Sequence, residues 1–197
     1  MSDPTPDLSI LTGGKTAREG ASTGDDPPYA DFGILIAKDG TWYHNGLPFT
    51  RMALVKLFAT VMQRAENGDY LLATPVERGR IEVEDAPFVA VEMLAEGEGQ
   101  DQKLKFRTNI DEWVTADADH PIWFVMDGDA DGSDEEPRPY LLVRPGVEGL
   151  PGLEALITRA VFYDLVELAE EQPDGALAVW SGGTLHHLGQ AGGQAGT

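Results

Sequence analysis

The chain has 197 residues, enough for one sizeable hydrophobic core or two small ones. Its 34 acidic and 14 basic side chains give a formal net charge of −20, and this negative field disfavours polymeric nucleic acid and anionic membranes as partners. The sequence contains no cysteine, which excludes disulfides, thiolate catalysis and cysteine-ligated zinc. No signal peptide or membrane-spanning run is recognisable, so we expect a cytoplasmic protein.

The two ends of the chain have the composition of disordered segments. Residues 1–30 are rich in proline and glycine, and residues 189–197 form a low-complexity tail. Between them we expect an α+β fold in two small lobes, an N-terminal α/β lobe over residues 31–76 and a C-terminal α+β lobe over residues 77–188. A hairpin before the first long helix and another after the second indicate repeated hairpin and helix motifs.

A hairpin opens the N-terminal lobe. Residues 31–44 have the composition of two strands joined at Asp39-Gly40, a pair that suits a two-residue turn with positive φ at both positions. Asn45-Gly46 predicts a second turn directly after this hairpin.

Two long helices are expected, one in each lobe. Residues 51–66 and 153–171 both place apolar side chains at the spacing of a helix with one buried face. Asn67-Gly68 ends the first helix, and Pro173 lies just beyond the second. The side chains predicted to be buried are Leu54, Leu57, Phe58, Val61 and Met62 in the first helix and Leu153, Leu156, Ile157, Val161, Leu165 and Leu168 in the second.

The most regular alternation lies between Arg80 and Asn109, which we interpret as one central sheet segment built around a hairpin. Gly97 and Gly99 mark the turn of this hairpin. Its alternating apolar positions are Val89, Val91 and Met93 on the first strand and Leu104 and Phe106 on the second.

Shorter strands are predicted on both sides of this segment, at residues 70–74, 113–114, 122–126 and 140–143. Residues 176–188 predict a closing hairpin around a Ser-Gly-Gly turn. Because side chains alternate along a strand, His186 and His187 should point to opposite faces and cannot form a spaced metal motif.

A second aspect of the central segment is its group of carboxylates. Glu82 and Glu84 share one strand face, where like charges raise the pKa of one member and suit it to act as a general base. The alternative is a solvated outer face opposite Ile81 and Val83, which the alternation alone also predicts. A hydrolase or transferase that uses Glu82 or Asp85 as its base therefore stays open as an alternative function.

An acidic loop interrupts the C-terminal lobe. Aspartates at alternate positions from Asp127 to Asp131, followed by Gly132, match the first half of a calcium loop. The twelfth position, however, is Arg138, where calcium needs a bidentate carboxylate. We expect residues 127–136 to be a solvated excursion between two strands, with calcium binding as the alternative, and we expect no cofactor and no metal.

Arginines are concentrated in the middle and the C-terminal part of the chain. Arginines that converge on one cleft of an acidic protein would clamp a phosphate or carboxylate group, because the guanidinium fork binds such groups bidentately. Pairing of each arginine with one of the many carboxylates is the alternative. The candidate ligand-binding residues are Trp42, His44, Arg80, Glu82, Asp85, Arg107, Asn109 and Arg159.

Several strings of residues together carry a family resemblance. They include DGTWYHNG, TPVERGRIEVEDAPFVAVEM, LKFRTN, DADHP, LEALITRAVFYDLVELA and VWSGG. With these strings the chain resembles the bacterial domain-of-unknown-function 1285 family over residues 31–188. The resemblance implies two α/β units with repeated motifs and a C-terminal half superficially like a pleckstrin-homology fold. It also implies a cleft between the units for a small nucleotide-like ligand, and a role in signalling.

These observations favour a non-enzymatic protein that binds a small anionic, nucleotide-type ligand between its two lobes. The missing nucleophile and metal motifs count against the catalytic alternative. A protein-interaction scaffold is the third hypothesis, and the sequence does not indicate an oligomeric state.

Overall fold

The computed structural model describes residues 29–75, 77–127, 136–147 and 149–190. The terminal segments predicted to be disordered lie almost wholly outside these residues, as does most of the acidic loop. Contacts divide the chain into two units, one of residues up to Pro87 together with Gly146–Gly152 and the other of the remainder. The fold is α+β with two units, in which strands predominate.

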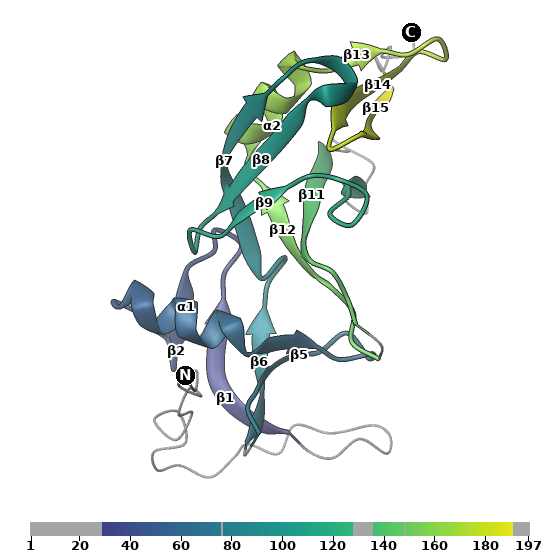
Figure 1. Cartoon of the computed structure of the whole chain (residues 1–197). Coiled ribbons are helices and arrows are strands. Elements are labelled where there is room, and N and C mark those ends of the chain that lie inside the picture. Colours follow the sequence, from purple (N-terminus) through teal and green to yellow (C-terminus); the bar gives the residue numbers. More distant parts are fainter. Residues whose placement is uncertain (1–28, 76, 128–135, 148, 191–197) are drawn as a thin grey trace, which may run out of the picture. The chain divides into compact units, whose positions relative to one another are not determined.

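In its described residues the first unit consists of a six-stranded sheet and one helix (Figure 1). Its elements are β1 (Ala30–Ile36), β2 (Trp42–His44), β3 (Leu47–Pro48), α1 (Met52–Thr60), β4 (Met62–Arg64), β5 (Tyr70–Ala73) and β6 (Arg78–Val83). The sheet has the order β3-β2-β1-β6-β5-β4. β1 and β6 run parallel, and the other neighbouring pairs are antiparallel.

Alternation along β1 builds the core of this unit. Phe32, Ile34 and Ile36 are all buried, as is Phe58 of α1. The ring of Phe32 lies directly over Gly79 of β6, where a Cβ atom would come within 2.4 Å of three ring carbons. The close approach of β6 to this ring therefore requires glycine.

The two turns predicted around β2 are present, but the first differs from the prediction. Only Gly40 has a positive φ, of 80°, so Asp39-Gly40 is not a two-residue turn with positive φ at both positions. Ala37 N–H instead bonds to Thr41 C=O, and the Asp39 carboxylate accepts the Thr41 N–H at 2.8 Å. The aspartate thus stabilises a longer loop through its side chain.

The first predicted helix is shorter than expected, and the prediction of one helix over residues 51–66 is wrong in its last part. α1 ends at Thr60, and Met62 begins β4, which pairs with β5. The backbone of β4 thereby completes the edge of the sheet, which a continued helix could not do. Within α1 the fully buried side chains are Val55, Phe58 and Ala59, whereas Leu57 is half-buried.

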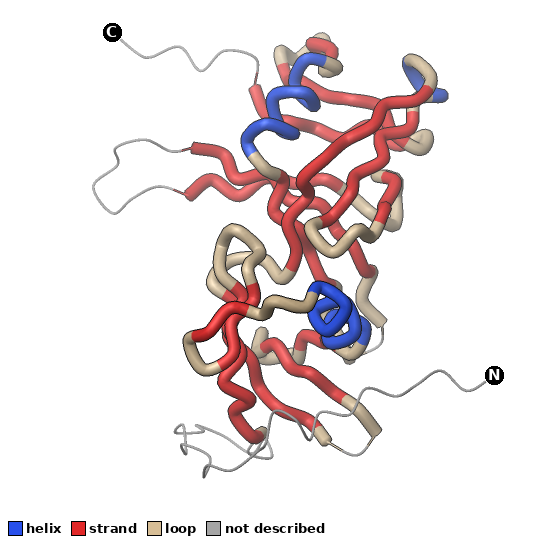
Figure 2. Tube along the Cα trace, turned by 90° about the vertical axis from the view of Figure 1, so that its left-hand side faces the viewer, coloured by secondary structure: helices blue, strands red, loops and turns tan. Residues whose placement is uncertain are grey.

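The described part of the second unit contains a strongly curled six-stranded sheet, a three-stranded sheet and one α-helix. Its elements are β7 (Phe88–Glu96), a 3-10 helix η2 (Gly99–Asp101), β8 (Lys103–Thr108), β9 (Trp113–Thr115), β10 (Ile122–Asp127), β11 (Glu136–Arg144), β12 (Leu153–Ile157), α2 (Arg159–Glu167), β13 (Glu170–Glu171), β14 (Ala176–Ser181) and β15 (Thr184–Gln190). The large sheet has the order β10-β11-β12-β7-β8-β9, with β12 parallel to β7. Figure 2 shows the β10–β11 hairpin extending beyond the rest of this sheet.

The second predicted helix is also partly wrong. Leu153–Ile157 form β12, and the helix α2 covers only Arg159–Glu167. This strand lies between β11 and β7, and Leu153, Ala155 and Ile157 are buried at alternate positions because successive side chains of a strand point to opposite faces of the sheet. The apolar residues of this stretch fit a helix as well as a strand, so their spacing alone could not decide.

The central hairpin is present as β7 and β8, but the segment that precedes it belongs elsewhere. Arg80 lies on β6, which pairs with β1 and β5 in the first unit, so the prediction of one sheet from Arg80 to Asn109 is wrong. A bulge between Ala90 and Glu92 breaks the alternation of β7 and leaves Val91 exposed.

Candidate functional site

A hollow of about 400 Å³ lies on the first unit and is open to solvent. Its volume falls in the usual range for small-molecule sites. The residues that line it come from β1, β5, β6 and the segments next to them: Leu35, Gly68, Asp69, Tyr70, Arg80, Ile81, Glu82, Val83 and Glu84. The charged part of this lining is one guanidinium group and three carboxylates.

The strand register explains why Arg80 and Glu82 both reach this hollow. They are two residues apart on β6 and are both exposed, while Ile81 between them is buried in the core. Glu82 lies beside Leu35 in the parallel β1–β6 pair, and Leu35 alternates with the buried Ile34 and Ile36. All three side chains therefore occupy the sheet face opposite the buried core residues.

The carboxylates of the lining have different partners. Arg80 Nη1 lies 3.4 Å from Asp69 Oδ2, and Asn67 Nδ2 donates to the same oxygen at 3.1 Å. Glu84 Oε2 accepts the Lys38 N–H at 2.9 Å and so ties the end of β6 to the loop after β1. Glu82 makes no hydrogen bond or ion pair with the residues that the structure describes, and its carboxylate faces solvent.

Two further predicted residues of the first unit, Trp42 and His44, pack against Phe49. Trp42 is buried, and its ring meets Phe49 edge-on with centroids 6.3 Å apart. His44 stacks on the same phenylalanine at 6.1 Å. Asp85, another predicted residue of the first unit, lies in the bend after β6. None of these three is among the residues that line the hollow.

The remaining predicted residues belong to the second unit. Arg107 Nε donates to Glu92, its Nη1 donates to Asp111 at 2.9 Å, and the bond to Glu92 is the main cause that raises the pKa of Arg107. Asn109 Oδ1 accepts the Val89 N–H at 3.0 Å. These contacts hold the β7–β8 hairpin together. Arg159 is the exposed first residue of α2.

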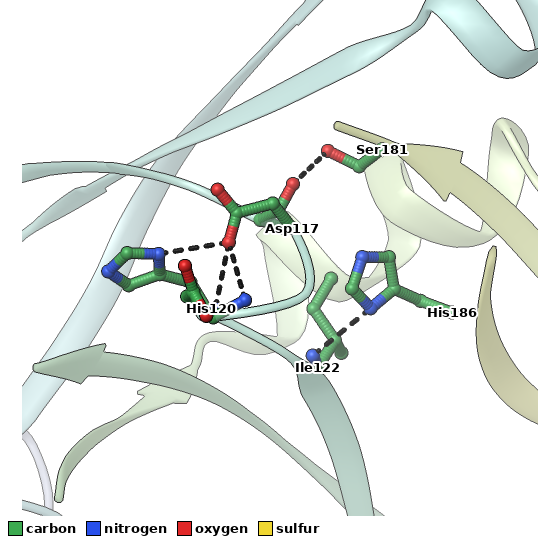
Figure 3. Close-up of polar contacts among 7 residues, drawn as sticks. Asp117, His120, Ile122, Ser181 and His186 are labelled. Carbon is green, nitrogen blue, oxygen red and sulfur yellow. Dashed lines mark hydrogen bonds and ion pairs between the residues drawn. The ribbon is translucent and has the colours of Figure 1, made fainter. Parts of the chain in front are cut away.

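A separate polar cluster in the second unit joins the closing hairpin to the large sheet (Figure 3). The Oγ of Ser181 donates to Ala116 C=O at 2.6 Å and accepts the Leu104 N–H at 2.9 Å. Ser181 is fully buried, and its one hydroxyl hydrogen is already committed. The hydroxyl is therefore a structural bridge and not a nucleophile. The sequence places Ser181 in the predicted Ser-Gly-Gly turn of the closing hairpin but gives no signal for this bridge.

His186 lies next to this bridge, and Figure 3 shows its ring directed at Ile122. Its Nδ1 accepts the Ile122 N–H at 3.3 Å, and its buried Nε2 has no partner among the described residues. Burial lowers the pKa of His186, which the Ser181 backbone and the charge of Asp117 only partly offset. His187 is exposed, so the prediction that the two histidines face opposite sides is confirmed.

Asp117 forms the other end of this cluster and organises the turn between β9 and β10. Its Oδ1 accepts the N–H groups of Asp119 and His120, both at 2.9 Å, and lies 3.0 Å from His120 Nδ1. Burial acts to raise the pKa of Asp117, but these hydrogen bonds outweigh it and leave the pKa below its usual value.

No three histidine, aspartate or glutamate side chains of the described residues gather closely enough to hold a metal ion. Neither described α-helix, at nine residues each, approaches the length of apolar helix that crosses a bilayer.

Fold and hollow together define a β-rich protein of two units with a polar, solvent-open site on the first. Family models divide the chain within one residue of the unit boundary at Pro87, although the second model also includes Gly146–Gly152 of the first unit. One described as the N-terminal domain of unknown function DUF1285 matches residues 25–86, and one described as the C-terminal domain of the DUF1285 protein of unknown function matches residues 87–188. The chain belongs to the DUF1285 family.

Solved structures agree with this assignment. The chain is similar to a DUF1285 family protein from Silicibacter pomeroyi, with 36% identity over 96% of this chain and 97% of that chain and a TM-score of 0.73. A DUF1285 family protein from Shewanella baltica is 25% identical over 68% of this chain and 91% of that chain, with a TM-score of 0.51. A comparison with curated proteins found no match. The likeness of the C-terminal unit to a pleckstrin-homology fold stays a prediction.

Proposed function

We propose that this protein is a cytoplasmic, non-catalytic binding protein that holds a small anionic ligand in the hollow at Arg80. The observation that carries the proposal is that the guanidinium group of Arg80 is exposed and only weakly paired. Its side chain is 54% exposed and makes one ion pair with the described residues, to Asp69 at 3.4 Å. An exposed pair at this distance is weak, so most of the five N–H donors of Arg80 remain available to a ligand.

Arginine is suited to this role because its planar fork binds carboxylate and phosphate groups through two parallel hydrogen bonds. Leu35 provides apolar surface in the same hollow, and Glu82 provides an acceptor. A nucleotide-type ligand with a single phosphate group and a role in signalling, which follow from what the family resemblance implies, remain part of the proposal. The site is placed on the first unit alone, with Arg80 and Glu82 as its contributors from the eight candidate residues.

Binding is favoured over catalysis by the composition of the lining. A hydrolase or transferase with Glu82 or Asp85 as its base also needs a nucleophile, a metal or a second proton-transfer group close by. The lining contains no serine, threonine, lysine, cysteine or histidine, and its other two carboxylates are already engaged: Asp69 accepts from Asn67 and pairs with Arg80, and Glu84 accepts the Lys38 N–H. The described residues also hold no metal cluster next to it.

A thermal-shift screen of small phosphates and carboxylates tests this proposal, because a ligand that binds the folded state raises the unfolding midpoint. Hits are then measured again with Arg80→Ala and with Arg78→Ala. Arg78 is the matched control, since it is exposed on the same face of β6 but does not line the hollow. Arg80→Ala should abolish the shift and Arg78→Ala should retain it. Equal shifts in both variants would place the ligand elsewhere.

A further inference from the structure

The charges around Arg80 restrict which anions the hollow accepts. Asp69, Glu82 and Glu84 line it together with Arg80, so the lining carries a net charge of −2 before any ligand binds. A ligand with a single negative group can be placed on the guanidinium. Each additional negative charge of a polyanion then meets a carboxylate instead, on a protein whose net charge is already −20.

Among these three carboxylates, Glu82 is the one available to contact a ligand. Asp69 is shared between Arg80 and Asn67, and Glu84 accepts the backbone N–H of Lys38. Glu82 has no such partner among the described residues and is exposed on the same sheet face as Arg80. Two residues along a strand separate their Cα atoms by roughly 7 Å. A small molecule can therefore contact both side chains at once.

We infer that the hollow selects small ligands that carry one anionic group together with an ammonium or similar donor group, and that it rejects polyanions. Arg80 binds the anionic group and Glu82 binds the donor. This inference rests on the proposed function and adds the class of ligand to it. The opposite charges of Arg80 and Glu82 thus become a specificity device, in which Glu82 attracts the correct ligand and repels the wrong one.

Three probes of similar size test this selectivity: O-phosphoethanolamine, ethyl phosphate and pyrophosphate. The first carries a phosphate and an ammonium group, the second a phosphate alone, and the third two phosphates. Their dissociation constants are measured by titration with the chain labelled for ¹H–¹⁵N spectra. O-phosphoethanolamine should bind roughly two- to fivefold more tightly than ethyl phosphate, as an exposed ion pair allows, and pyrophosphate should bind most weakly.

Glu82→Gln supplies the decisive variant, with Glu66→Gln as its control, because Glu66 is an exposed glutamate of the same unit outside the hollow. Glu82→Gln should remove the advantage of O-phosphoethanolamine and strengthen pyrophosphate binding, whereas Glu66→Gln should change neither. Both substitutions remove one negative charge, so a general charge effect would act on both alike.

The outcomes separate the inference from the proposed function. If ethyl phosphate binds through Arg80 but O-phosphoethanolamine binds no more tightly, the selectivity is refuted and the binding function stands. The same holds if Glu82→Gln leaves the order of the three probes unchanged. If no anionic probe perturbs the residues around Arg80, the proposed function itself is refuted.

Discussion

Arg80 and Glu82 lie two residues apart on β6 and line the same hollow, with opposite charges on one face of the sheet. The buried Ile81 between them anchors the strand in the core on the other face. The position of both charged groups is therefore set by a rigid element and not by a mobile loop, which is the arrangement that a binding site requires.

Replacement of Arg80 should affect ligand binding much more than stability. Its ion pair with Asp69 is exposed and long, so Arg80→Ala should lower the free energy of unfolding by less than about 1 kcal/mol. Urea denaturation of the wild type, Arg80→Ala and Arg78→Ala measures this. A loss of several kcal/mol specific to Arg80→Ala would mean that Arg80 is a structural residue.

Arg107 should show the opposite behaviour. It bonds to Glu92 and Asp111 within the second unit, so Arg107→Ala should lower the melting temperature of the ligand-free protein. It should leave binding of a phosphate probe at the Arg80 hollow unchanged. Loss of binding with an unchanged melting temperature would restore Arg107 to the site that the sequence predicts.

Ser181 should be a strong contributor to the stability of the second unit. Ser181→Ala leaves the buried Leu104 N–H and Ala116 C=O without their partner, which should cost about 1–3 kcal/mol. Thr184 is paired with Ser181 across the closing hairpin but is only half-buried, so Thr184→Ala should cost less than about 0.5 kcal/mol. Chemical denaturation compares the two variants, and equal losses would argue against the bridge.

His186 should make stability depend on pH. Because its pKa in the folded state lies below the usual value of 6.5, the unfolded chain binds a proton more readily than the folded protein. The contribution of His186 is fully present above pH 6.5 and is lost as the pH falls through the lower pKa of the folded state. The lowered pKa of Asp117 makes a separate contribution to stability, which is present above pH 3.8 and is lost as the pH falls through the lower pKa of the folded state.

Melting temperatures between pH 7.5 and pH 5 test this contribution. The wild type and His187→Gln should lose stability over that range, and His186→Gln, which cannot titrate, should lose less. Exposed His187 supplies the matched control for buried His186. An identical pH profile for all three proteins would show that His186 is already protonated in the folded state or has no net linkage.

The sequence predicts a fold well where local signals and tertiary structure agree. Asn45 and Gly46 both adopt positive φ, 50° and 80°, in the turn that their identity indicates. The glycine-marked hairpin of β7 and β8 and the closing hairpin of β14 and β15 are also present. In each case the turn residues and the strands they join lie within a few residues of each other.

Elements whose state depends on distant strands could not be predicted in this way. Leu153–Ile157 form a strand that pairs with β11 on one side and β7 on the other. Met62 is not part of the helix, because it begins β4 and pairs with β5. The candidate site was affected for the same reason. In the sequence Arg80 and Arg107 both belong to the predicted central segment. In the structure, however, Arg80 pairs with residues of β1 and β5, whereas Arg107 pairs with residues of β7 and β9.

The most direct test of the account follows the arginine side chains themselves. In a ¹H–¹⁵N spectrum of the arginine Nε–H groups, titration with O-phosphoethanolamine should shift the Arg80 signal, assigned by its loss in Arg80→Ala, in a saturable manner. The signals of Arg78 and Arg107 should stay in place. A saturable shift of Arg107 with Arg80 unmoved, or no shift of Arg80 at any probe concentration, would contradict the placement of an anion site on the first unit.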